Sequence, residues 1–381
     1  ITNPLFPTGT LTQVIQLGDE EGKPARVEAT LLPGTKVIDW NGKVETVVRQ
    51  FIASSDRRIV EVALDYFAQA DDGSVWYFGE DVFNYEDGVV ADREGSWLAG
   101  KDGPAGMIMP AQPKAGDVYR PENIPGLVFE EVTVKAAGET IEGPRGPVAG
   151  AVLTREHLME NTFEDKAFAP GYGESRIKAG DEFVQVALAV PTDALPGAPP
   201  AELDALSTGA VAIFNAAGAG DWATASDGLG TLTGAWATYQ AGEVPKLLGA
   251  QTKGALDALT SAVNARNPAT ARQAAVDLDR AILDLRLRHR PPAAVDLARL
   301  GPWALQVQID AAAGDAGAVA GDVAILETIR DRMAHTLDAA GAEALKASLA
   351  QLRRAADGKD VSAAAGAVPA LLATLAGLRP V

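Results

Sequence analysis

The chain has 381 residues, of which 47% are hydrophobic and 22% are charged, so it carries enough apolar material for more than one packed core. Its 33 basic and 51 acidic residues give a net charge of −18, which argues against nucleic acids and anionic membrane surfaces as partners. The absence of cysteine excludes disulfides, thiolate metal sites and cysteine nucleophiles.

The first residues, "ITNPLFP", begin with Ile1 instead of methionine. Such a start is typical of a mature protein from which an export signal has been removed. We therefore expect a periplasmic or extracellular bacterial protein, with an artificial chain start as the alternative.

Short β-type runs separated by Gly and Asp turns make up residues 1–192. Strands are expected at 26–32, 45–51, 59–69, 74–80, 128–135, 149–155 and 182–190. The turn signals between them include "WNGK", "DDGS", "EDGV" and "GKDG". Because such short turns join antiparallel neighbours, the pattern predicts a curved antiparallel sheet or a partly open β-barrel.

The stretch "DDGSVWYFGEDVFNYEDG" contains a strand that is apolar on both faces. Such a strand is normally covered on both faces, and the segment "GSWLAGKDGPAGMIMP" is a candidate for the second cover. In that arrangement Trp76, Phe78 and Trp97 would line a ligand pocket together with the methionines of "MIM". Plain core packing of these side chains is the alternative.

Methionine is scarce, with four residues, and three pairs of soft donors occur at a spacing of two. One of them, Met333 and His335, lies on an expected helix, where this spacing places the two side chains on different faces. Met107 and Met109 form "MIM", and His157 precedes Met159 in "REHLMEN". On a strand, this spacing would place both donors of a pair on one face, and Cu(I) prefers such donors. The pattern therefore offers a copper site, with core filling and a surface histidine as the plainer alternatives.

Calcium is the other cation that the composition suggests, because it prefers carboxylate and carbonyl oxygens in loops. Asp71 and Asp72 lie in one acidic turn, and Glu80 and Asp81 lie at the end of the following strand. No segment matches the twelve-residue EF-hand loop. An ordinary hairpin turn explains each acidic pair equally well.

Several motifs occur in a fixed order in the first 190 residues: "NPLFPTGT", "DYFAQADDGSVWYFGED", "YEDGVV", "GSWLAGKDG", "GMIMPAQPKAGDVYRPE" and "KAFAPGYGE". Together they resemble an exported bacterial family of uncharacterised function whose members carry a "DWYAQDxDGNVWYFGED"-like core. The resemblance implies export and a β-rich first domain. It implies no activity and no catalytic residues.

The composition changes in "VPTDALPGAPPAEL", where four prolines predict a linker over residues 193–202. Residues 1–200 hold 32 acidic and 17 basic residues, a net of −15, whereas residues 201–381 hold 19 and 16, a net of −3. The acidity is therefore a property of the first domain.

Residues 203–381 are predicted to form an α-helical domain with an internal repeat. Four Asx residues are placed like N-caps at spacings of 46, 48 and 45 residues, namely Asp221, Asn267, Asp315 and Asp360. A leucine follows each cap by eleven positions, and a preceding helix is expected at 202–217, 246–265, 294–312 and 341–356. The pattern indicates four helical hairpins, arranged as a solenoid or as a compact bundle.

Two further segments of this half need an interpretation. The basic run "RLRHR" is placed at a helix C-terminus, where the helix dipole favours cations, with docking to an acidic surface as the alternative. The uncharged run Val361–Leu378 is rich in Ala and Gly and contains a proline, so it is expected to be a buried helix without membrane insertion.

These observations predict an exported, non-enzymatic binding or scaffold protein. The acidic β domain would bind a cation, a small ligand or a basic partner, and the helical domain would contact another protein or a second copy of the chain. The alternatives are a periplasmic metal-handling protein that uses copper or calcium, and a hydrolase that uses two carboxylates. No nucleic acid partner and no transmembrane segment are expected.

Overall fold

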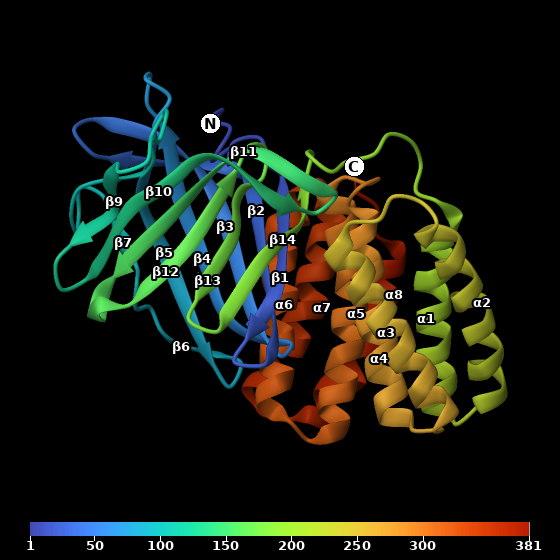
Figure 1. The fold of residues 1–381 in the computed structure, drawn as a ribbon. Coiled ribbons are helices and arrows are strands. Elements are labelled where there is room, and N and C mark those ends of the chain that lie inside the picture. Colours follow the sequence, from blue (N-terminus) through green and yellow to red (C-terminus); the bar gives the residue numbers. More distant parts are fainter. Residues whose placement is uncertain (381) are drawn as a thin grey trace. The chain divides into compact units, whose positions relative to one another are not determined.

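The computed structural model describes residues 1–380 and divides the chain into two compact units. The β unit consists of Ile1–Glu86 and Val90–Asp193, and the helical unit consists of Asp87–Val89 and the chain from Ala194 onward. The predicted α+β architecture is confirmed, because the described residues form an antiparallel sheet followed by eight α-helices (Figure 1).

The β unit is a long antiparallel meander. Its strands are β1 (Gln13–Glu20), β2 (Lys23–Asp39), β3 (Lys43–Ser55), β4 (Arg58–Gln69), β5 (Val75–Glu86), β6 (Val89–Asp92), β7 (Trp97–Leu98), β8 (Gly106–Met109), β9 (Val118–Ile124), β10 (Val128–Gly143), β11 (Gly146–Leu158), β12 (Phe163–Ala169), β13 (Gly173–Ala179) and β14 (Glu182–Val190). The order in the sheet is β6-β5-β4-β3-β2-β1-β14-β13-β12-β11-β10-β9, and β7 and β8 also pair with β5. The first and last strands are therefore neighbours at its centre.

The sheet curls strongly because bulges interrupt its register. Register shifts occur at Ile15/Gln16, Leu31/Thr35, Asp65/Phe67, Glu130/Val132, Val134/Ala136 and Ala167/Phe168. Each bulge bends its strand and increases the local twist. As a result, Phe6 contacts both Phe67 of β4 and Phe168 of β12, with ring centroids 5.1 and 6.4 Å away. Strands far apart in the sheet thus face each other across one apolar core.

The helical unit contains α1 (Ala201–Ala219), α2 (Trp222–Gln240), α3 (Lys246–Asn264), α4 (Pro268–Arg286), α5 (Pro292–Ala313), α6 (Ala316–Met333), α7 (Ala339–Asp357) and α8 (Val361–Gly377). The α1 helix packs against α2 and α4, and α3 packs against α4 and α2. In the same way, α5 packs against α6 and α8, and α7 packs against α8 and α6. The four hairpins therefore pack in two groups of four helices, and α4 and α5 pack against each other between the groups.

The predicted repeat is visible as four turns with the same geometry. Each predicted cap accepts a hydrogen bond from the backbone N–H three residues later, through Asp221, Asn267, Asp315 and Asp360. The residue before each cap has a positive φ, at Gly220 (71°), Arg266 (50°), Gly314 (75°) and Lys359 (53°). The leucines eleven positions after the caps, Leu232, Leu278, Leu326 and Leu371, are each fully buried.

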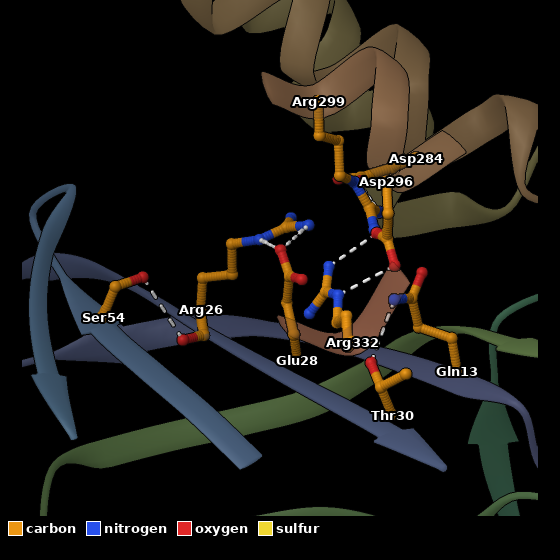
Figure 2. A network of polar contacts seen from close by, with 9 residues as sticks. All are labelled: Gln13, Arg26, Glu28, Thr30, Ser54, Asp284, Asp296, Arg299 and Arg332. Atoms are coloured by element: carbon orange, nitrogen blue, oxygen red, sulfur yellow. Dashed lines mark hydrogen bonds and ion pairs between the residues drawn. The ribbon is translucent and has the colours of Figure 1, made fainter. Parts of the chain in front are cut away.

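Two polar features accompany these folds (Figure 2). In the β unit, Arg26 of β2 donates to Glu28 of the same strand at 2.8 Å. In the helical unit, Asp296 of α5 accepts from Arg299 at 2.8 Å and from Arg332 of α6 at 2.6 Å.

Among residues 1–380, the α-helices are either too short or too polar to cross a membrane.

Candidate functional site in the acidic interior of the β unit

Carboxyl groups line part of the inside of the curled sheet. They come from eight residues on seven strands, namely Glu61, Asp65, Glu80, Glu122, Glu130, Glu156, Glu164 and Glu174. The charge of Glu174 on β13 acts on Asp65 of β4, although four strands separate β4 from β13 in the sheet. Such coupling requires both side chains to point into the curl. We call this set of eight residues the acidic interior.

One half of the acidic interior surrounds a lysine. The Nζ atom of Lys166 on β12 lies 2.6 Å from Glu156, 3.5 Å from Glu164, 3.5 Å from Glu174 and 3.7 Å from Glu130. Burial disfavours the charged amine, but the four carboxylates outweigh it and hold the pKa of Lys166 well above its usual range. This group shows that the interior accommodates an ammonium ion.

The other half contains three carboxyl groups that influence one another, Asp65, Glu80 and Glu122, which we call the carboxyl triad. Burial, with the charges of Asp65 and Glu122, raises the pKa of Glu80 to about 10. Burial likewise raises the pKa of Asp65 to about 7 and also raises that of Glu122, which is hydrogen-bonded to Glu80. At neutral pH the triad therefore retains protons. Burial also raises the pKa of Glu156, beside Lys166, well above its usual range, and the charge of Lys166 opposes this shift.

Two aromatic side chains border the carboxyl triad. Tyr77 of β5 donates through its hydroxyl to Asp65 at 3.3 Å. Trp97 of β7 donates through Nε1 to Glu122 at 2.8 Å, and its ring packs edge-on against Tyr77 at 5.4 Å. Carboxyl groups beside aromatic rings are the combination that recognises organic cations, through ion pairing and cation–π attraction.

A buried hydroxyl without a partner lies in the same interior. Tyr119 of β9 is 8% exposed, and its hydroxyl has no hydrogen-bond partner among the described residues. Burial and the nearby carboxyl groups of Glu156 and Glu130 raise its pKa. An unsatisfied buried hydroxyl is costly, so a bound polar group or water is expected to satisfy it.

The predicted pocket residues are divided between this interior and a separate hollow. Trp97 faces the acidic interior, whereas Phe78 is a core residue with 6% exposure. Trp76 lies opposite Met107 in the β5–β8 pair, and both line a hollow of about 430 Å³ beside β9. Trp76 and Met107 therefore line one hollow that does not include Trp97 or Phe78, and ligand binding by these residues stays a prediction.

The predicted copper donors do not converge in pairs. Met109 is fully buried in the core, whereas Met107 lies at the hollow. His157 of β11 stacks on Phe163 at 4.8 Å, and Met159 is in the following 3₁₀ turn with 37% exposure.

The predicted calcium ligands are similarly dispersed. Asp72 accepts hydrogen bonds from the Ser74 backbone and hydroxyl, as a turn residue does. Glu80 points inward, whereas Asp81 pairs with Tyr66 and Lys36. Among residues 1–380 there is no group of three or more His, Asp or Glu side chains placed to hold a metal ion. Copper and calcium binding stay predictions.

Sequence reasoning singled out Glu80 and Trp97 but missed Asp65, Glu122, Tyr119 and Lys166. The available signal was a charged residue at an inward position of an apolar strand, as in "IVEVALDYFAQ". No family model matches this chain, and a search of curated proteins found no match.

Proposed function

We propose that this chain is a non-enzymatic binding protein whose β unit holds a small organic cation with a primary ammonium group. The proposal places the ammonium at the carboxyl triad, against the rings of Tyr77 and Trp97. The observation that carries it is the contrast within one interior. Four glutamate side chains enclose the amine of Lys166, whereas the triad has no lysine or arginine within ion-pair distance among the described residues.

The chemistry of the triad supports an exchange of protons for a cation. Carboxyl groups whose pKa is raised by burial and mutual repulsion regain their charge when a cation arrives between them. An entering ammonium would therefore displace protons from Glu80 and Glu122 and donate hydrogen bonds to their oxygens. Binding of this kind releases protons in proportion to the ligand bound.

Calorimetry with benzylammonium as the probe and benzyl alcohol as its neutral counterpart tests this proposal. Titrations at pH 7.5 in two buffers of different ionisation enthalpy report the protons released per ligand. We expect benzylammonium to bind with proton release and benzyl alcohol to give no signal. Glu80→Gln should weaken binding by about tenfold or more, because a charge-assisted contact is lost.

Glu86→Gln is the matched control, since Glu86 lies exposed at the end of the same strand and changes the net charge equally. Equal effects of the two variants, or binding of benzyl alcohol, would contradict the proposal. Calcium chloride forms a third arm. If calcium binds and benzylammonium does not, and if calcium binding is lost in Glu80→Gln, then the ligand of the acidic interior is a metal ion and not an organic cation.

For the helical unit we propose contact with a partner protein, because stacked helical hairpins present broad surfaces. Export to the bacterial envelope or beyond it is part of the same proposal. Fractionation of the source cells, with detection of the chain by an antibody, would test the location.

A further inference from the structure

A second hollow lies on the β unit, over strands β10 to β14. Its volume is about 710 Å³, which is within the range of small-molecule sites. Its lining includes Lys135, Arg176 and Lys178 together with Leu153 and Phe183. Lys166, which pairs with glutamates, and the carboxylates of Asp165 and Asp181 also line it, so the hollow combines three further cations and two carboxylates with apolar surface, in a domain whose charge is strongly negative.

The sheet register explains why these side chains gather. Phe183, Lys178 and Asp165 are direct partners across β14, β13 and β12, so they share one face of the sheet. Arg176 lies two residues before Lys178 and therefore on that face as well. Lys135 is the extra residue of a bulge opposite Leu153, which turns it toward the same region.

The three cations have no acidic partner within ion-pair distance among residues 1–380. Asp165 is the cross-strand neighbour of Lys178, yet the two do not form a pair. Arg176 is half-buried, so its charge is partly removed from water without compensation. In a chain with 51 acidic residues, this retention of free positive charge in a concave surface calls for an external anion.

We infer that this hollow binds a small organic anion, with its carboxylate or phosphate between Arg176, Lys178 and Lys135 and its apolar part against Leu153 and Phe183. This is a second site, opposite in charge preference to the acidic interior. It stands on different residues and does not depend on the organic cation proposed above. Arginine is suited to the anionic group because its planar guanidinium donates two parallel hydrogen bonds.

Amide chemical-shift titration of the full chain with phenyl phosphate tests this inference, with inorganic phosphate and benzyl alcohol as separate probes. We expect phenyl phosphate to shift amides of β10 to β14 and to bind more tightly than either fragment. Arg176→Gln/Lys178→Gln should weaken binding by about tenfold or more, and added salt should weaken it further. Lys43→Gln, an exposed lysine on β3, is the control for lost positive charge and should change affinity less than about twofold.

Each result decides a part of the inference. Equal affinity for phenyl phosphate and inorganic phosphate would show that Leu153 and Phe183 do not contribute to binding, which would contradict the apolar part of the proposed site. Absence of shifts in β10 to β14, or equal loss in the Lys43 variant, would overturn the inference altogether. The dispersion of the amide spectrum shows whether each variant is folded, and single Arg176→Lys and Lys178→Gln variants retain a readout if the double variant is not.

Discussion

In the helical unit, replacing a residue of the buried ion pairs should cause the largest loss of folding stability. Asp296 bridges Arg299 and Arg332, and Arg299 also reaches Asp284 at 2.7 Å. All four side chains are at most 3% exposed. Taking charges out of water is expensive, so each arginine depends on its carboxylates.

We therefore predict that Asp296→Ala lowers the free energy of unfolding by about 3–5 kcal/mol, because it leaves two buried guanidinium groups with less compensation. Urea denaturation followed by circular dichroism at 222 nm measures the change. Lys253→Ala, which breaks an exposed pair with Asp257, is the control and should cost less than about 1 kcal/mol. A loss of the same size in both variants would show that burial does not set the cost.

Asp65 should make the β unit less stable as the pH rises. Burial raises its pKa from 3.8 to about 7, with Arg49 opposing and Glu61 adding to the shift. Between these two values the folded state holds a proton that the unfolded chain releases. The contribution of Asp65 to the free energy of unfolding is therefore fully present below pH 3.8 and decreases as the pH rises to about 7. We predict that Asp65→Asn flattens this part of the stability profile, as measured by urea denaturation at intervals of pH. An unchanged slope would mean that Asp65 ionises freely in the folded protein.

At the level of elements, the four repeated turns of the helical unit offer an internal comparison. Gly220 and Gly314 occupy the left-handed position without strain, whereas Arg266 and Lys359 adopt it at a cost of about 1 kcal/mol each. We predict that Arg266→Gly and Lys359→Gly each raise the free energy of unfolding by roughly 0.5–1 kcal/mol.

The reverse changes serve as controls in the same fold. Gly220→Ala and Gly314→Ala should each lower stability by about 1 kcal/mol, and no atom lies within 4 Å of the added methyl group, so a clash cannot account for the loss. Thermal unfolding of all four variants gives the comparison. A loss in the two glycine-gaining variants would show that the replaced side chains make contacts that outweigh the backbone cost.

These helical turns were predictable because their signals are local. An Asx side chain that caps a helix acts within three residues, and the buried leucine follows at a fixed distance along the same helix. The strands were harder to predict from the sequence. The expected strands overlap β2, β3, β4, β5, β10, β11 and β14, with 74–80 starting one residue before β5. In contrast, β9, β12 and β13 carry charged residues at inward positions and therefore lack apolar alternation.

The acidic interior was only partly predictable for the same physical reason. Glu80 and Trp97 stood out beside turns and aromatic residues, but Glu122 and Lys166 acquire their roles through strands distant in sequence. No local pattern in the sequence indicates which carboxyl groups will meet across a curled sheet. Register shifts such as Asp65/Phe67 also move side chains between faces, which simple alternation does not anticipate.

For the whole molecule, the uneven charge makes the two units respond differently to salt. Residues 1–200 carry a net charge of −15 and residues 201–381 a net charge of −3. Repulsion among like charges destabilises a compact state and is screened by salt, since the Debye length falls from about 30 Å at 0.01 M to about 8 Å at 0.15 M. We predict that raising the salt concentration stabilises the β unit more than the helical unit.

Hydrogen exchange followed by mass spectrometry measures this in the intact chain, because peptides report each unit separately. Sodium chloride and choline chloride should slow exchange in β-unit peptides equally, as screening depends on ionic strength and not on the identity of the cation. A larger effect of choline would instead indicate occupation of the acidic interior by an organic cation, and Glu80→Gln should then remove the difference. Equal responses of the two units to either salt would show that the surplus carboxylates of the β unit are already neutralised, by retained protons in the interior or by cations held there.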